Sequence, residues 1–268
     1  MGRTGTVDAV DPTARFAELV NGPEDALPLD QAALLVAAHA YPSLDVDAEL
    51  AMLDSLAPVG GSGLGAWRRR LFVDLGFRGD LGNYYDPRNS YLNDVVRRRI
   101  GLPIALSVVG MELGRRMGVG LVGVGMPGHF LLKSTDDADV FVDPFDGGRV
   151  LDREGCRERF HAVNGRESTF DESFLDPVGP RAILARMLAN LKSIFAHQGN
   201  VPSLEWVLAL RLAIPGVPLL ERRDRARLWA AAGRFPEAAE DLEDLACALP
   251  DLADALEAEA VALRARLN

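Results

Sequence analysis

The segment GLPIALSVVGMELGRRMG, residues 101–118, decides the fold because it predicts a helix that is apolar on nearly every side. Pro103 suits the first turn, where its missing N–H would have no helical partner anyway. A helix with apolar residues around most of its circumference must be buried on most sides, so it is expected to be the central helix. Gly118 ends it. Its charged residues are spaced i, i+3 and i+4 and are expected to pair at an exposed end: Glu112, Arg115 and Arg116.

Three strand-like runs follow this helix: VGLVGVG (119–125), HFLLK (129–133) and DVFVD (139–143). A Pro-Gly turn separates the first two, and the polar run STDDAD separates the last two. The sequence DPFDGGR, which begins with Asp143, then predicts a tight turn. A buried helix followed by a meander of strands is typical of an α+β fold.

His129 and Asp143 stand out because they lie at the start of one predicted strand and at the end of the next. If the two strands are antiparallel neighbours, these ends lie side by side. An imidazole oriented by a carboxylate is two-thirds of a nucleophile–base–orienter triad. The alternative is purely structural: His129 bonds locally and Asp143 caps the turn that follows it.

The run GVGMPG, residues 123–128, matches the dinucleotide-binding pattern G-x-G-x-x-G letter for letter. That pattern works only when a helix N-terminus follows and receives the pyrophosphate. Here a predicted strand follows, and Pro127 stiffens the loop. We therefore expect no nucleotide cofactor.

The place for a nucleophile is the N-terminus of the central helix, where the helix dipole lowers the pKa of a thiol. No cysteine lies there. Ser107, one turn into the helix, is a candidate substitute, and Cys156 in the charged run REGCRERF is a weaker one. Cys247 is expected in the core of the C-terminal part.

The segments before the central helix read as further helices. Asp30 and Asp45 are candidate N-caps of two of them, and Asn89 or Ser90 is a candidate cap of a third. The glycine-rich run PVGGSGLGAW, residues 58–67, is interpreted as a flexible loop and not as a phosphate cradle.

The C-terminal part is predicted to be all-helical and to repeat. Thirty-four residues is the period of tetratricopeptide units, which are antiparallel helix pairs with a small residue at the turn. We expect two domains, residues 1–178 and 179–268. The residues that match at this period are Phe195 and Trp229, Gly199 and Gly233, Pro202 and Pro236, and Leu208 and Leu242.

Composition limits the partners. A net charge of −10 argues against nucleic-acid binding, because phosphate contacts require clustered Lys and Arg. No apolar run approaches the ~18–20 residues of a membrane span, and no apolar signal segment opens the chain. The two cysteines form neither a disulfide framework nor a zinc spacing, so we expect no metal and a cytoplasmic location.

The order of helix, strand with histidine and strand with Asp-Pro resembles the transglutaminase-like, papain-related fold. In particular the chain resembles the SirB-type branch, whose members join such a core to a tetratricopeptide-like tail. In active enzymes of the superfamily a cysteine opens the central helix, and its position matches Pro103 here. Their histidine matches His129 and their aspartate matches Asp143. The runs that carry the resemblance are NSYLNDVVRRRIGLPIALS (89–107), GVGMPGHFLL (123–132) and FVDPFDGG (141–148).

Two hypotheses follow from the missing nucleophile. In the first, the domain is non-classical or catalytically silent and binds a protein or peptide, with the helical tail adding partner surface. In the second, it is an amidase or acyl transferase of altered mechanism, in which His129 activates water or an amine and Asp143 orients the ring. The sequence leaves the substrate, the partner and the oligomeric state open. Candidate groove residues are Asn83, Tyr84, Tyr85, Asp86, Asn89 and Ser90.

Overall fold

The computed structural model describes residues 11–57 and 62–267. The chain divides into two compact units, one ending at Asn190 and one beginning at Leu191. The division falls inside helix α8 (Pro180–Gln198), whereas the predicted boundary after residue 178 lies just before that helix. No helix in the described ranges is long and apolar enough to cross a membrane.

Three helices open the first unit: α1 (Pro12–Asn21), α2 (Leu29–Ala38) and α3 (Val46–Leu56). Asp45 caps α3 as predicted, since its side chain accepts the N–H of Ala48. The prediction for Asp30 was wrong: Pro28 precedes α2, and Asp30 lies within its first turn and faces two arginines of another helix.

The glycine-rich connection is only partly a loop. Residues 58–61 lie outside the described ranges. From Gly63 onward the predicted loop is wrong, because α4 (Gly63–Arg68) begins there and continues as a π-type turn over Arg69–Asp74. The reason is tertiary: Trp67 is fully buried and its indole N–H donates to the carbonyl of Gly110, 2.9 Å away.

A short parallel pair, β1 (Arg78–Gly79) and β2 (Ile100–Gly101), frames the segment before the central helix. Between these strands lie a 3₁₀ turn over Pro87–Asn89 and helix α5 (Leu92–Arg98). Neither predicted cap of α5 was right. Tyr91 precedes that helix without a side-chain cap, because the side chain of Asn89 is used to close the preceding loop.

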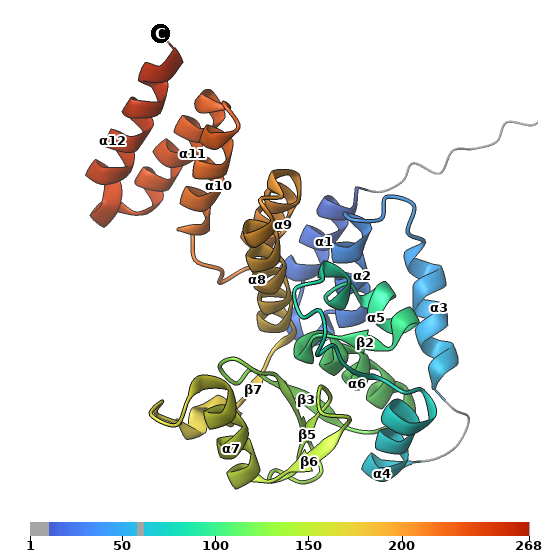
Figure 1. Cartoon of the computed structure of the whole chain (residues 1–268). Helices are drawn as coiled ribbons and strands as arrows, with labels where there is room; N and C mark the ends of the chain where they lie inside the picture. The colour runs from blue at the N-terminus through green and yellow to red at the C-terminus, as the bar shows by residue number, and fades with distance from the viewer. Residues whose placement is uncertain (1–10, 58–61, 268) are drawn as a thin grey trace, which may run out of the picture. The chain divides into compact units, whose positions relative to one another are not determined.

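The central helix α6 (Pro103–Met117) begins and ends as predicted, with Gly118 in the left-handed conformation at φ 69°. It packs on a five-stranded sheet of order β6-β5-β4-β3-β7, in which every neighbouring pair is antiparallel (Figure 1). At Gly110 a Cβ would lie 2.9 Å from a methyl carbon of Leu132, so the close approach of helix and sheet requires glycine. The sheet elements are β3 (Leu121–Val124), β4 (Leu131–Ser134), β5 (Phe141–Asp143), β6 (Arg149–Leu151) and β7 (Pro177–Val178), with α7 (Arg153–Asn164) and a 3₁₀ turn (Glu172–Leu175) between the last two.

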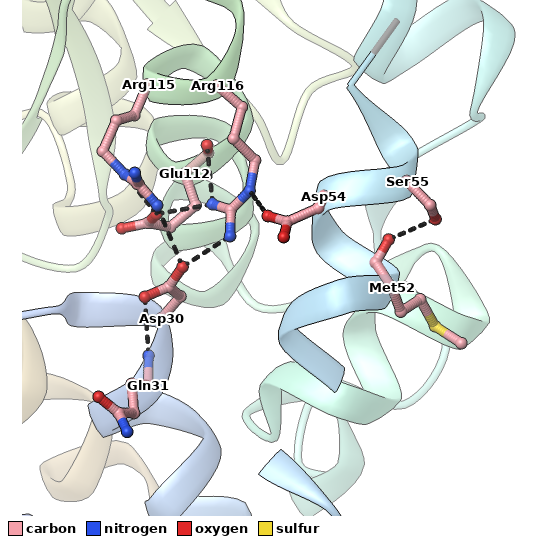
Figure 2. Close-up of polar contacts among 8 residues, drawn as sticks. All are labelled: Asp30, Gln31, Met52, Asp54, Ser55, Glu112, Arg115 and Arg116. Carbon is pink, nitrogen blue, oxygen red and sulfur yellow. Dashed lines mark hydrogen bonds and ion pairs between the residues drawn. The ribbon is translucent and has the colours of Figure 1, made fainter. Parts of the chain in front are cut away.

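The charged end of α6 pairs as predicted and is exposed in part, since Arg115 is exposed whereas Glu112 and Arg116 are largely covered. Figure 2 shows Arg116 between three carboxylates: Asp30 of α2 at 2.9 Å, Asp54 of α3 at 2.6 Å and Glu112 at 2.9 Å. Burial alone would raise the pKa of Asp30, but the hydrogen bonds of Arg116 and Glu112 lower it overall. Burial and the nearby Asp30 charge raise the pKa of Glu112. The network therefore joins the N-terminal helices to α6.

The second unit consists of stacked helices: α9 (Val201–Ala213), α10 (Glu221–Ala231), α11 (Phe235–Ala248) and α12 (Ala253–Arg264), after the last turns of α8 (Figure 1). The 34-residue spacing corresponds to two turns, at Gly199 (φ 64°) and Gly233 (φ 79°), each followed by a proline in the first turn of the next helix. Cys247 is exposed, so its predicted core position was wrong.

Candidate functional site

His129 is held by a tight turn directly before β4. Gly128 adopts φ 74°, and the backbone N–H of His129 donates to the carbonyl of Met126 at 3.0 Å. Leu132 in β4 pairs with Val142 in β5, and the two strands are antiparallel. The start of β4 and the end of β5 therefore lie side by side. The His129 ring therefore lies at the C-terminal end of β5.

Asp143 is the expected neighbour. Its Oδ2 lies 2.9 Å from His129 Nε2, and the carboxylate is fully buried. Its Oδ1 accepts the backbone N–H groups of Phe145 at 3.0 Å and Asp146 at 3.2 Å. One carboxylate thus contacts the ring and caps the turn, so the geometry fits both interpretations of this aspartate.

Arg159 of α7 completes this pair, with its Nε 3.1 Å from Asp143 Oδ2. Burial would raise the pKa of Asp143, but the hydrogen bond and charge of His129, together with the Arg159 charge, lower it overall. Arg159 was not predicted as a site residue from the sequence. Nothing in the local pattern of α7 distinguishes it from the other arginines of that charged helix.

Phe145 covers one side of the histidine. Its ring meets the His129 ring edge-on at a centroid distance of 6.1 Å, and the Tyr84 ring at 6.2 Å. Gly79 donates its N–H to the carbonyl of Phe145 at 3.2 Å, and a Cβ at Gly79 would lie 2.5 Å from that ring. Gly79 also pairs with Gly101, which lies two residues before α6. The segment that leads into the central helix is therefore joined to the strand that contacts Phe145.

No nucleophile is exposed at the start of α6. Pro103 is its first residue and is buried. Ser107 is fully buried and donates its hydroxyl to the Pro103 carbonyl at 2.8 Å, which argues against the substitute role proposed for it from the sequence. Cys156 lies in an apolar cluster, and burial raises the pKa of its thiol to about 12. Among residues 11–57 and 62–267, no cluster of His, Cys, Asp or Glu is placed to hold a metal.

Hydrogen bonds cross-link the loop between β1 and α5, and only part of the predicted groove is on its surface. Asp80 accepts the N–H groups of Gly82 and Asn83, while the Asn89 amide donates to Asp80 Oδ2 at 2.9 Å and to the Asn83 carbonyl at 2.8 Å. Three of the predicted groove residues are buried: Asp86, Asn89 and Ser90. The exposed side chains at the tip are Leu81 (89%), Tyr84 (41%) and Tyr85 (58%).

Arg186 of α8 holds the histidine turn from the other side. Its Nη2 donates to the carbonyls of Met126 and His129, both at 2.8 Å, and its guanidinium lies over the Phe130 ring at 5.6 Å. Burial lowers the pKa of this arginine. Arg186 was not predicted from the sequence either, because the contacts of this side chain join segments about sixty residues apart.

The amino-acid sequence of this chain is similar to those of several known proteins. The family described as the transglutaminase-like superfamily matches residues 44–189. The UPF0162 protein of Xylella fastidiosa (strain Temecula1) is 38% identical over 240 residues, covering 82% of this chain and 83% of that protein. A UPF0162 protein of Pseudomonas aeruginosa is 34% identical over 183 residues, 64% of this chain and 66% of its own. Human F-box only protein 21 is 29% identical over 179 residues, 62% of this chain but 28% of its own. No solved structure matches.

Proposed function

Because the chain belongs to the transglutaminase-like superfamily and to the UPF0162 proteins, we propose that it is a SirB-type domain that binds a protein or peptide segment without acyl transfer. The observation that carries this proposal is the buried Pro103 at the first position of α6. A proline side chain has no group that can form a thioester. The base and orienter positions, His129 and Asp143, then serve the architecture of the binding surface.

The proposed contact surface is the tip of the β1–α5 loop, defined by Leu81, Tyr84 and Tyr85. Exposed apolar groups gathered on one loop are typical of interaction sites, and tyrosine is enriched among the residues that dominate binding energy. The hydrogen bonds of Asp80 and Asn89 hold the loop in place before any partner arrives. A surface that is ordered in advance loses less conformational entropy on binding.

A random peptide library displayed on phage, panned against the full chain, tests this surface. Selected peptides are expected to bind at least about tenfold more weakly to L81A/Y85A, as is typical when interface anchors are truncated. Val73→Ala is the matched control, since Val73 is equally apolar and 73% exposed but lies outside the loop. Peptides that bind all three proteins alike would rule out the loop tip.

The second candidate is a hydrolase in which His129 acts on water. The intact 2.9 Å contact with Asp143 favours it, together with an Nδ1 that forms no hydrogen bond within the described ranges. If the domain only binds, it should neither hydrolyse p-nitrophenyl acetate nor transfer a fluorescent amine to dimethylcasein. A rate that disappears in His129→Ala, but not in the control His161→Ala at a half-buried position of α7, would replace the binding proposal with the hydrolase.

A further inference from the structure

A small polar pocket lies apart from the histidine site, between the α2–α3 connection and α5. Its volume is about 350 Å³, at the lower end for small-molecule sites. Asp45 and Arg97 are exposed at its rim, whereas Glu49 and Asn93 are only 5% and 2% exposed and form its floor. It shares no residue with the site around His129.

The floor of this pocket has two buried oxygens without a partner. Within the described part of the chain, Oδ1 of Asn93 accepts no hydrogen bond. Glu49 pairs with Arg97 through Oε1, but its Oε2 is also without a donor. Most buried polar side-chain atoms in folded proteins have a partner, and leaving one unpaired opposes folding. Two such atoms in one pocket indicate that a donor from outside the chain belongs there.

The charges around the pocket define that donor. Three carboxylates line it, those of Asp45, Glu49 and Asp94, against the single cation Arg97. Asp94 already accepts the hydroxyl of Tyr41 at 2.6 Å, so it offers further lone pairs and no hydrogen. A group that fits must therefore carry positive charge and several hydrogens. No three His, Cys, Asp or Glu side chains in the described ranges are placed to share a metal ion, which leaves an organic cation.

We propose that this pocket binds a primary alkylammonium group, as carried by a lysine side chain or a free alkylamine. An ammonium supplies three N–H donors on a compact charge. Two of them would satisfy Glu49 Oε2 and Asn93 Oδ1, and charge-assisted hydrogen bonds of this kind are the stronger ones. The alkyl chain would leave through the rim.

The test is a titration of the full ¹⁵N-labelled chain, followed by NMR at the side-chain amide of Asn93. Propylamine and Nα-acetyl-lysine methylamide are both cationic at pH 7, and 1-butanol is the neutral control. A saturable shift with either amine supports the proposal. Tighter binding of the lysine derivative identifies a peptide as the source, and tighter binding of propylamine identifies a free amine. No shift with either amine, or an equal shift with butanol, overturns it.

Two variants distinguish a role in amine binding from a role in the stability of the fold. Glu49→Gln and Asn93→Leu should each weaken amine binding roughly tenfold or more, the loss expected for one charge-assisted hydrogen bond. Asp47→Asn removes a carboxylate from the same helix outside the pocket and should change binding less than twofold, about the effect of a screened surface charge. Because Oδ1 of Asn93 accepts no hydrogen bond from the described residues, its loss in Asn93→Leu should not lower the melting temperature. A lowered melting temperature with unchanged amine binding would make Asn93 structural and overturn the proposal.

Discussion

Replacing Asp143 by asparagine should lower the free energy of unfolding by about 3 kcal/mol at neutral pH. The wild-type carboxylate is fully buried and meets four donors, from His129, Phe145, Asp146 and Arg159. The amide oxygen of the variant still accepts the two backbone N–H groups. Its NH₂ end, however, would face the Nε–H of Arg159, so two donors oppose each other and Arg159 keeps only the more exposed Asp146 as a counter-charge.

The magnitude follows from these contacts. A hydrogen bond to a charged group contributes about 1.5–3 kcal/mol, and removing one partner of a fully buried ion pair costs about 3–5 kcal/mol. The Arg159 side chain is 24% exposed, so water partly replaces the lost charge and the lower end of the second range applies. His129 limits the loss further, because its other tautomer can accept from the new amide.

The pH dependence has a defined sign. The folded protein holds the pKa of Asp143 below its ordinary value, so the unfolded chain takes up this proton more readily than the folded one. The stabilisation by the carboxylate is therefore fully present above the ordinary aspartate pKa of about 3.9 and is lost as pH falls through the lower folded value. The difference between wild type and variant should be constant from pH 7 to 5 and shrink below about pH 4.

Urea denaturation at pH 7, 5 and 3.5, followed by circular dichroism, measures this difference. Asp146→Asn is the matched control, because Asp146 also pairs with Arg159 but its side chain is 46% exposed. An exposed pair contributes at most about 1 kcal/mol, so the control should change stability little. Equal losses for the two variants, or a difference that persists unchanged at pH 3.5, would refute the reasoning.

Three further outcomes are expected. Gly79→Ala should cost about 1–3 kcal/mol in urea denaturation, because its Cβ would lie 2.5 Å from the Phe145 ring, whereas Gly65→Ala, with open space around it, should be neutral or stabilising. Asp30→Asn should cost about 2 kcal/mol by the same method, since it removes charged hydrogen bonds to Arg116 at a nearly buried site; a loss no larger than that of Asp54→Asn, whose side chain is 68% exposed, would contradict this. A thiol reagent such as 5,5′-dithiobis(2-nitrobenzoate) should titrate one cysteine in the folded protein and two after unfolding; prompt reaction of both in the folded state would show that Cys156 is not buried.

Periodicity along the chain was enough to predict the central helix and the helical hairpins. The apolar residues of 101–118 surround the helix axis, which is a local property of the sequence. The 34-residue spacing likewise predicted the turns at Gly199 and Gly233, because each turn needs a residue that accepts positive φ. The proximity of His129 and Asp143 followed from the same kind of reasoning, since a hairpin of adjacent strands brings their positions together.

Local pattern failed where a side chain has a choice of partners. Asp30 has the residue type of a cap, but in the folded chain it is drawn into the ion pairs of Arg116, more than eighty residues away. Asn89 closes a loop instead of capping α5, and its side chain is fully buried there.

What the sequence by itself determined is therefore the central helix, the turns of the helical hairpins and the His129–Asp143 pair, because all three depend on spacing along the chain. Only the tertiary structure decided which charges surround that pair and which polar atoms stay unpaired. Arg159 and Arg186 reach the site from other helices, and Oδ1 of Asn93 is buried without a partner among the described residues. The physical reason is that burial and pairing are properties of three-dimensional neighbours, and such neighbours leave no periodic signal in one sequence.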